Sequence, residues 1–289
     1  MATSAGGTVQ LIYNPTAGQH CVKRLAALRR GFEAGGARVI LSESAPGLTL
    51  SIHEEASHVC AVGGDATLRH DALAIARSGR PMPLSVYPGG TVNLLQREFA
   101  SPVDPAAHAA RALSGEAACP HYAAEINETL FLACASVGPD SRAVAAVTPR
   151  LKRAFGKVAY VVAFLGVLAR WERPSIRLVC DGREIACEAF YVAKGRYYAG
   201  SWSFASAACR TAPLLHGVAL TRARRRDYLR FVLALLRGQP VERLPGVIAF
   251  TGTRLTAEAD APLPIQADGD IVGALPVRIE LRPDPLSFR

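Results

Sequence analysis

Three short stretches of the chain carry residue types suited to binding a phosphate group. They are residues 14–18 (NPTAG), 63–67 (GGDAT) and 88–93 (PGGTVN), and each follows a short apolar run. Glycine lets the backbone approach an anion closely, and a helix that starts after such a loop offers unpaired N–H groups. The second and third stretches lead into helical patterns. Together the three predict a phosphate-binding site, whereas a Gly-Gly or Pro-Gly pair taken alone is also typical of an ordinary turn.

Asp65 lies in the middle of the second stretch. A carboxylate beside a phosphate-binding loop would repel the ligand unless a divalent cation lay between them. We therefore expect the bound phosphate to belong to a magnesium–nucleotide complex, with Asp65 as the protein ligand of the metal.

The ordered set of motifs resembles the diacylglycerol kinase catalytic family, which includes bacterial lipid kinases and the sphingosine and ceramide kinases. NAD kinase and phosphofructokinase are more distant likenesses. The family pattern is NPxxG, GGDGT and PxGTxN in this order. Three later segments, residues 156–160, 192–200 and 265–270, are similar to the family's GKxAY, VxNxxxxGG and QxDGE. The resemblance therefore covers nearly the whole chain.

The resemblance implies an ATP-dependent lipid kinase, which moves the γ-phosphoryl group to the hydroxyl of diacylglycerol or a similar lipid. Asp65 would act through Mg²⁺, and Asp270, at the end of the third segment, would be the general base on the lipid hydroxyl. Positioning and charge neutralisation supply most of the catalysis in such a transfer. The resemblance further implies that the nucleotide is bound by Asn14, Pro15, Gly18, Ser42, Gly63, Gly64, Asp65, Ala66, Thr67 and Thr91.

Two departures from the family pattern fall in the second motif. Ala66 replaces a glycine, and its Cβ would be unfavourable if the position required a positive φ or close approach of a phosphate. The acid that usually follows this motif is replaced by His70. Asp71 comes one position later, which on a helix turns the side chain by about 100°.

Two further departures fall in the second half of the chain. Asp270 replaces a glutamate and is shorter by one methylene, and a misplacement of about 1 Å can cost about 10²-fold in rate. His216 replaces an aspartate that supplies structural Mg²⁺ ligands in the family, and imidazole is a poor substitute for carboxylate at Mg²⁺. We do not expect that metal site here.

These departures leave alternatives open. The first is a nucleotide- or lipid-binding protein of the same fold with weak or lost kinase activity. The second is a kinase for a different hydroxyl substrate. No motif distinguishes diacylglycerol from ceramide, sphingoid bases or polyprenol-like alcohols, and a homodimer is left open.

The first 120 residues alternate strand-like and helical patterns. Strands separated by helices predict an α/β domain with an open, mainly parallel sheet, in which ligands bind at the carboxyl ends of the strands. We expect a nucleotide-binding domain similar to that of NAD kinase and phosphofructokinase. The predicted strands are 9–13, 37–41, 58–62 and 84–87, and the predicted helices are 20–34, 67–78, 91–98 and 104–114.

The pattern changes near residues 118–122, which predicts a second domain over 121–289. It would be mostly antiparallel β and bind the lipid, with its last residues left free to return to the first domain. Turn signals occur at residues 127–128, 181–182 and 268–269. We expect strands within 121–126, 129–136, 175–180, 185–194, 247–256 and 276–281, and helices at 150–171 and 225–237.

The formal net charge of +9 is unevenly spread over the 289 residues. Residues 1–120 carry 10 Lys and Arg against 9 Asp and Glu, whereas residues 142–237 carry 18 against 5. A basic region favours an anionic partner. No nucleic-acid recognition motif is present, so we expect contact with an anionic membrane surface through Arg222, Arg224, Arg225 and Arg226.

The longest apolar run, residues 158–169, is too short for a bilayer, which needs about 20 residues. The seven scattered cysteines show no metal-ligand spacing, and the N-terminus has no signal-peptide pattern. We therefore expect a cytoplasmic protein that associates peripherally with membranes, with reduced thiols.

Overall fold

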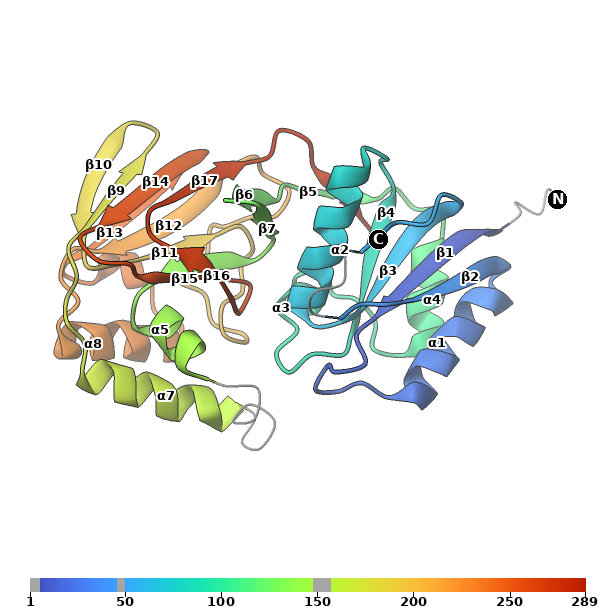
Figure 1. The fold of residues 1–289 in the computed structure, drawn as a ribbon, viewed down its shortest axis with the longest axis horizontal. Helices are drawn as coiled ribbons and strands as arrows, with labels where there is room; N and C mark the ends of the chain where they lie inside the picture. Colours follow the sequence, from blue (N-terminus) through green and yellow to red (C-terminus); the bar gives the residue numbers. More distant parts are fainter. Residues whose placement is uncertain (1–5, 46–49, 148–156) are drawn as a thin grey trace. The chain divides into compact units, whose positions relative to one another are not determined.

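The computed structural model describes residues 6–45, 50–147 and 157–289. They form two compact units (Figure 1). The first unit comprises Met1–His121 together with Pro285–Arg289, and the second comprises Tyr122–Asp284. The predicted fold class, an α/β unit with a parallel sheet and a mostly antiparallel β unit, is confirmed.

The first unit is built on one six-stranded sheet of order β2-β1-β3-β4-β18-β5. The first four strands of the chain run parallel; β18, from the chain's end, pairs parallel to β4 and antiparallel to β5. Five of the eight residues of β3 are apolar, and all five are buried, as expected of a parallel strand covered on both faces. The strands are β1 (Gly6–Tyr13), β2 (Ala37–Glu43), β3 (Ala56–Gly63), β4 (Pro83–Pro88), β5 (Cys119–His121) and β18 (Leu286–Phe288).

Helices pack on this sheet through apolar residues. Leu28 and Phe32 of α1 and Ala109 and Ala112 of α4 join Val9 and other strand residues in one buried cluster. Helix α2 contacts β3 and buries Leu68, among other residues. The helices are α1 (Val22–Ala34), α2 (Asp65–Ser78), α3 (Leu94–Glu98) and α4 (Pro105–Leu113), each within two or three residues of a predicted helix.

The second unit contains two antiparallel six-stranded sheets, of order β10-β9-β14-β17-β6-β7 and β13-β12-β11-β8-β15-β16. A single cluster of buried apolar residues contains side chains of both sheets, so the two form a sandwich. The strands are β6 (Ala124–Ile126), β7 (Thr129–Phe131), β8 (Cys134–Val137), β9 (Ile176–Cys180), β10 (Arg183–Cys187), β11 (Ala189–Ala193), β12 (Leu215–Leu220), β13 (Val247–Gly252), β14 (Arg254–Ala259), β15 (Pro264–Ala267), β16 (Asp270–Ala274) and β17 (Val277–Leu281).

Helices of the second unit cover the outer face of the second sheet. Leu168 of α7 and Tyr228, Phe231 and Leu235 of α8 share a buried cluster with Tyr191 of β11. The predicted helix at 150–171 is described only from residue 157, because its start lies outside the described residues. The helices are α5 (Pro139–Ala146), α7 (Lys157–Ala169), α8 (Arg225–Leu236) and the 3₁₀ turn η1 (Val241–Arg243).

Three predicted strands are each divided between the two sheets in the structure. The pattern at 129–136 forms β7 and β8, that at 185–194 forms β10 and β11, and that at 247–256 forms β13 and β14. The sequence patterns gave no prediction for β12 or α5. The divided strands have a common cause, because apolar alternation alone does not encode which of two sheets a strand joins.

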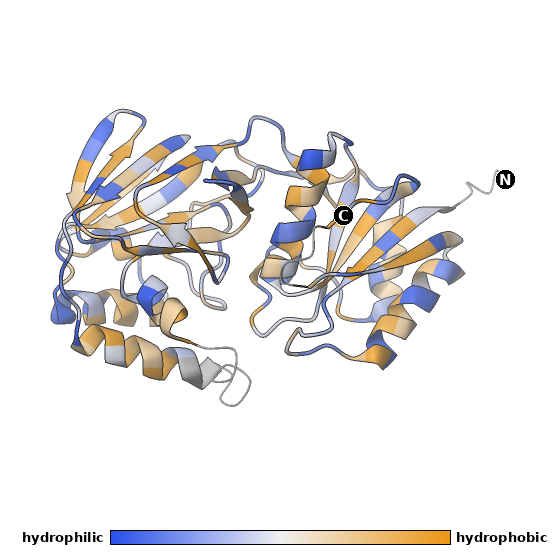
Figure 2. Cartoon of the chain, in the orientation of Figure 1, coloured by the Kyte–Doolittle hydropathy of each residue, from blue (hydrophilic) through white to orange (hydrophobic). Residues whose placement is uncertain are grey.

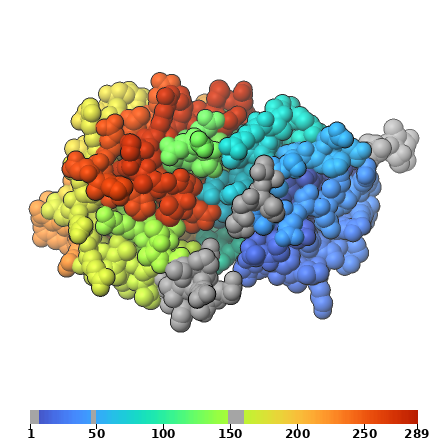
Figure 3. All heavy atoms as spheres, in the orientation of Figure 1, coloured from blue at the N-terminus to red at the C-terminus, as the bar shows by residue number. Residues whose placement is uncertain are grey.

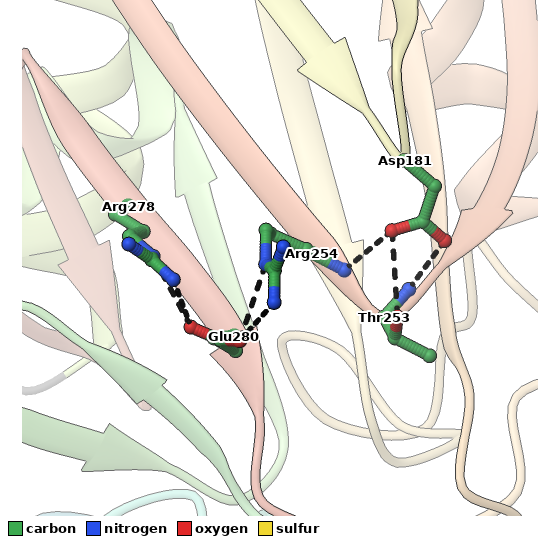
Figure 4. A network of polar contacts seen from close by, with 5 residues as sticks. All are labelled: Asp181, Thr253, Arg254, Arg278 and Glu280. Carbon is green, nitrogen blue, oxygen red and sulfur yellow. Dashed lines mark hydrogen bonds and ion pairs between the residues drawn. The ribbon is translucent and has the colours of Figure 1, made fainter.

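The predicted turn at 181–182 has both central residues at positive φ, as a two-residue hairpin requires. Figure 4 shows how this turn is held. The Asp181 carboxylate accepts hydrogen bonds from the backbone N–H groups of Thr253 and Arg254, both at 2.9 Å. Glu280 accepts from Arg254 and Arg278 on the same sheet. The Asp181 side chain thus fixes the β9–β10 turn to the connection between β13 and β14.

Candidate functional site

The three predicted phosphate-binding loops meet at the carboxyl ends of β1, β3 and β4. The Asn14 N–H donates to Val62 O at 3.2 Å, which joins the first loop to β3. The Gln19 N–H donates to Gly89 O at 2.9 Å, and the Gly89 N–H donates to Gly63 O at 2.8 Å. Backbone hydrogen bonds therefore link all three loops at one edge of the sheet, where ligands of parallel sheets bind.

The glycines of the second and third loops are required by the contact between the loops. A Cβ on Gly90 would lie 2.5 Å from Gly64 Cα, and one on Gly89 would lie 3.1 Å from Gly63 Cα. Neither distance leaves room for a side chain, because the neighbouring atom is backbone. The two glycine pairs pack backbone against backbone, so the loops present main chain at this edge.

Asp65, the first residue of α2, connects the second loop to the third. Its two carboxylate oxygens accept hydrogen bonds from the N–H groups of Leu94 and Leu95, each at 2.9 Å. These N–H groups open α3, whose preceding residue, Asn93, has a positive φ of 55° and no side-chain cap. Asp65 therefore caps α3 from a different segment, a structural role that the sequence motif does not reveal.

The fit of this site to Mg²⁺ follows from its donor set. Among the described residues, no group of three or more His, Cys, Asp or Glu side chains could hold a metal ion. Asp65 is a single carboxylate whose oxygens already accept two N–H bonds. Such a donor fits an ion that is bound mainly by nucleotide phosphates and water, which is how Mg²⁺ is commonly held in kinases.

Ala66 and Thr67 lie in the first turn of α2, after the N-cap residue Gly64, which has no side-chain cap. Ala66 is absent from the residues with positive φ, so the strain anticipated from the missing glycine does not arise. The Thr67 side chain is buried against Gly63. Among these residues, it is therefore the backbone N–H groups at the start of α2 that suit a phosphate.

The remaining predicted nucleotide contacts divide into two groups. The Asn14 side chain accepts from the Thr16 N–H at 2.9 Å and so shapes the first loop, which also contains Pro15. Gly18 lies against the Thr91 hydroxyl, so these two residues belong to the loop cluster. Ser42 lies apart on β2, where its hydroxyl accepts from the buried Gln10 side chain at 2.9 Å.

Arg24 is a residue of this region that sequence reasoning missed. Its guanidinium lies 5.0 Å from the centre of the Tyr87 ring and donates to the Tyr87 hydroxyl at 3.3 Å. A shallow pocket beside the loops is lined by Arg24, Asn14, Gln19, His20 and Pro88, among others. A cation in a pocket beside these loops suits an anionic ligand, but a single arginine in a helix gives no sequence signal for this role.

In the second unit, the Asp268-Gly269 turn joins β15 to β16, and both residues have positive φ. Asp268 is buried, and its carboxylate accepts from the N–H groups of Leu132, Ala133 and Cys134 at 2.8, 2.8 and 3.1 Å. This turn carries the predicted base, Asp270, which is partly exposed at the start of β16. Asp268 thereby fixes the backbone that positions Asp270.

A buried polar network supports the same turn. Gln266 accepts from the Gly269 N–H at 3.0 Å and donates to the Ser136 hydroxyl at 2.7 Å. Ser136 donates in turn to Asp140 at 2.5 Å, which also accepts from Tyr191 and Tyr198 at 3.0 and 2.9 Å.

Burial raises the pKa of Asp140, opposed by the hydrogen bonds from its hydroxyl partners. The sequence analysis did not single out Asp140. Gln266, which is linked to it through Ser136, and Asp268 both lie within residues 265–270, the segment similar to the family's QxDGE.

The segment in which the family places a structural magnesium site has a different donor set here. His216 lies on β12, and its pKa is lowered by burial and by the charge of Lys194. The Lys194 ammonium is buried and donates to the backbone carbonyl groups of residues just before β12. An imidazole and an ammonium do not fit Mg²⁺, which prefers oxygen ligands. A nearby cavity of about 370 Å³, lined by His216, Phe204 and Phe250 among others, contains none of the predicted site residues.

Comparison with known proteins agrees with this arrangement. The sequence model of the diacylglycerol kinase catalytic domain matches residues 8–119. The model of the YegS C-terminal NAD kinase beta sandwich-like domain matches residues 133–288, more than half of the chain. The chain belongs to the diacylglycerol kinase catalytic family.

Relatives in this family are named as kinases. A Pseudomonas aeruginosa protein named probable lipid kinase YegS-like is 36% identical over 150 residues, which are 52% of this chain and 46% of that protein. The diacylglycerol kinase of Bacillus subtilis is 23% identical over 276 residues, covering 92% of this chain and 91% of the relative. The matched region thus spans about half the length of the YegS-like relative.

A solved structure titled as a diacylglycerol kinase from Bacillus anthracis str. Sterne has a TM-score of 0.76 and 19% identity, covering 98% of this chain and 96% of that one. At this level of identity the likeness establishes the fold of the family.

Asp71 and His70, at one departure from the family pattern, face different surroundings. Asp71 is fully buried in α2, whereas His70 before it is exposed. Asp71 therefore does not take the place of the acid that His70 replaces, because its side chain faces the core. Burial raises its pKa well above the ordinary value.

Proposed function

We propose that the protein is an ATP-dependent lipid kinase, which transfers the γ-phosphoryl group to a lipid hydroxyl such as that of diacylglycerol. The observation that carries this proposal is the meeting of three main-chain loops at the carboxyl edge of the parallel sheet. These loops lie in a chain whose two parts both match models of the lipid kinase family. Its relatives' names support a kinase-type enzyme.

The first unit would bind the nucleotide. The backbone N–H groups at the start of α2 would meet the phosphates, with Gly63, Gly64, Gly18 and Thr91 shaping the surface beside them. Arg24 would supply positive charge at the edge of this surface. Mg²⁺ would arrive with the phosphates and neutralise their charge, with Asp65 as its protein ligand.

The second unit would supply the base. The lipid oxygen would form a bond to the γ-phosphorus as the bond from that phosphorus to the β–γ bridging oxygen breaks. The hydroxyl proton would pass to the Asp270 carboxylate. A general base of this kind typically contributes about 10²- to 10⁴-fold, and the anchored turn at Asp268 would keep Asp270 in place.

The decisive experiment measures transfer of ³²P from γ-labelled ATP to lipids presented in mixed micelles. The panel should include diacylglycerol, ceramide, a sphingoid base and a polyprenol. Asp270→Asn should lower the rate at least about 10²-fold, with little change in affinity for ATP. Asp260→Asn is the matched control, because it removes the same charge from an exposed carboxylate outside the site.

A folded protein that labels no lipid on the panel would overturn the kinase proposal. If it then binds ATP or lipid without turnover, the alternative of a binding protein with lost activity would replace it. The departures at His70 and Asp270 from the family pattern are the observations that keep this second candidate in view.

We further propose that the second unit docks on anionic membranes through the exposed side of α7 and α8, which we call the α7–α8 face. None of the helices in the described ranges has the length and hydropathy needed to cross a membrane. Helix α7 is nonetheless largely hydrophobic, and it reaches the surface of the second unit (Figures 2 and 3). Its exposed fractions are 57% for Val161, 62% for Val162 and 55% for Leu165.

Helix α8 adds a second apolar strip. Leu229, Leu233 and Leu236 are exposed, and their spacing places them on one side of the helix. The two helices adjoin, because the rings of Phe164 and Tyr228 lie 5.7 Å apart. Six of the eleven large hydrophobic residues exposed in the described ranges therefore lie on this face. Such a concentration marks an interaction surface.

Arginines at the start of α8 match this face to an anionic lipid surface. Arg224 and Arg226 are exposed, while Arg225 donates to the Ala169 carbonyl oxygen of α7. Arg222 pairs with the buried Asp227 at 3.1 Å. We therefore assign headgroup contact to Arg224 and Arg226 and exclude Arg222, which the sequence had grouped with them.

Vesicle flotation tests this assignment. Binding to vesicles that contain phosphatidylglycerol should fall at least about tenfold in Arg224→Gln/Arg226→Gln and in Leu229→Asp/Leu233→Asp. Val103→Asp and Arg38→Gln are controls at exposed positions of the first unit. Undiminished binding of both double variants would refute the α7–α8 face and leave the kinase proposal untouched.

A further inference from the structure

Lys194 directly follows β11, and its side chain is completely buried. The ammonium group lies among backbone carbonyl oxygens of one short segment. Its Nζ is 2.8 Å from Cys209 O, 2.5 Å from Ala212 O and 3.3 Å from Leu214 O. A six-residue segment, 209–214, thus wraps around one positive charge just before β12 begins.

The physical cost of this arrangement indicates that it is built rather than incidental. A buried ammonium is strongly unfavourable unless its donors are satisfied, because it loses its hydration. A lysine has three N–H donors, and three carbonyl oxygens surround this one. The ring of Tyr122, 5.9 Å from Nζ, adds an aromatic face to the surroundings. Clustered carbonyl oxygens around a buried charge are the surroundings that proteins also give to metal cations.

Two departures from the family pattern meet at this point. Lys194 stands where the pattern has asparagine, and His216 stands where it has the aspartate of the structural magnesium site. The two positions are close in the fold, because Ala193 pairs with His216 between β11 and β12. One replacement brings a positive charge into the protein, and the other removes a carboxylate that would bind a metal.

We propose that the Lys194 ammonium is an internal cation that replaces a divalent metal ion as the charge around which residues 209–214 fold. The second unit then needs no metal for its structure, and Mg²⁺ enters this protein only with the nucleotide. This inference does not depend on the proposed kinase activity.

The segment that Lys194 holds also supports the start of the second unit. The Tyr122 N–H, at the beginning of that unit, donates to Arg210 O at 3.1 Å. The charge on Lys194 helps to lower the pKa of His216, which favours its neutral form. Loss of the ammonium would therefore loosen both the segment and the first residues of the unit.

Thermal unfolding of the nucleotide-free protein, in EDTA and in millimolar Mg²⁺ or Ca²⁺, tests the proposal. The wild-type Tm should be the same in all three conditions. Lys194→Met should lower Tm by roughly 5 °C, because three carbonyl groups lose their donor, and metal should not restore it. The double variant Lys194→Asn/His216→Asp should gain a rise in Tm of several degrees on adding metal, as a newly opened site binds it.

Matched single variants separate the two positions. His216→Asn retains the lysine, so its Tm should not respond to metal. A wild-type Tm that falls in EDTA and recovers with Mg²⁺, or a Lys194→Met variant as stable as wild type, would overturn the proposal. So would a double variant that shows no metal response.

A second measurement covers variants that fail to fold. Hydrogen exchange of the wild-type chain at residues 209–214 should be unchanged between EDTA and Mg²⁺. Faster exchange of that segment in EDTA would also refute the internal cation.

Discussion

The two units differ in how fully several of their buried ionisable groups are hydrogen-bonded. In the second unit, Asp268 accepts three N–H bonds, Lys194 donates to three carbonyl groups and Asp140 accepts from three hydroxyls. In the first unit, neither carboxyl oxygen of the buried Asp71 has a hydrogen-bond partner among the described residues. These three groups of the second unit are held by hydrogen bonds, whereas Asp71 of the first unit is buried without one and must remain neutral.

The buried histidines of the first unit also remain neutral in the folded state. His58 bonds to the Ser85 hydroxyl at 2.8 Å, and His108 contacts the Cys60 sulfur at 3.5 Å. Burial lowers the pKa of His58 to about 3 and that of His108 to about 4. The stability of the first unit should therefore vary with pH, while the stability of the second should depend on intact hydrogen-bonded networks.

The largest effect is expected in the second unit. Asp268→Asn should lower the free energy of unfolding by about 3–5 kcal/mol, because one of its oxygens becomes an amide donor facing buried N–H groups. Asp270→Asn, two residues away and partly exposed, is the control and should change stability by less than about 1 kcal/mol. Urea unfolding measures both values. Equal effects of the two substitutions would show that Asp268 does not anchor the turn.

Low pH should destabilise mainly the first unit. The unfolded histidines bind protons below their ordinary pKa of 6.5, whereas the folded ones resist protonation until about pH 3–4. Stability is therefore present above pH 6.5 and is lost as pH falls. At pH 5 the loss is about 2 kcal/mol for each histidine.

Hydrogen exchange of the full chain resolves this loss by segment. Peptides of β3 and α4 should lose more protection between pH 7 and 5 than peptides of the sandwich in the second unit. His58→Gln cannot titrate and can still hydrogen-bond to Ser85, so it should reduce the pH dependence by about half. An unchanged dependence would show that other groups drive the acid response.

Asp71 should give the opposite dependence of stability on pH within the same unit. Burial raises its pKa, so its cost to the fold grows as pH rises above the ordinary value of 3.8. Asp71→Val should raise the free energy of unfolding by about 1–3 kcal/mol near neutral pH, because an unsatisfied buried group is removed. The gain should be smaller at pH 4. A gain independent of pH would show that packing, rather than titration, is responsible.

The fold of the first unit can be predicted from local sequence signals more completely than the fold of the second. In the first unit, three of the four predicted strands, all except 37–41, are followed by a loop that contains glycine and then by a helical pattern, so the order and type of most elements follow from local signals. The sequence also placed the three loops at one sheet edge. It could not show that Gly63 and Gly89 make contact, because that depends on the packing of neighbouring strands.

In the second unit, local signals identify turns but not sheets. The Asp-Gly pairs at 181 and 268 form two-residue turns as predicted. By contrast, Cys187 and Ala189 alternate in one apparent strand, although they belong to different sheets. The networks of Asp140 and Lys194 assemble residues far apart in the sequence, so no local pattern could have indicated their partners.

The smallest effect is expected at Asp65, where the first unit uses the aspartate clamp that the second uses at Asp268. Asp65→Asn should lower the free energy of unfolding by about 0.5–2 kcal/mol, the usual cost of losing a helix cap. Hydrogen exchange at Leu94 and Leu95 should accelerate, since these N–H groups bond to its carboxylate. Asp260→Asn, an exposed charge-matched change in the other unit, should leave this exchange unaltered. Because the clamp needs no nucleotide, the acceleration should appear in its absence, while any loss of phosphoryl transfer appears only with MgATP. Unchanged exchange at both residues would mean that Asp65 does not hold α3, and that the second unit alone anchors its loops in this way.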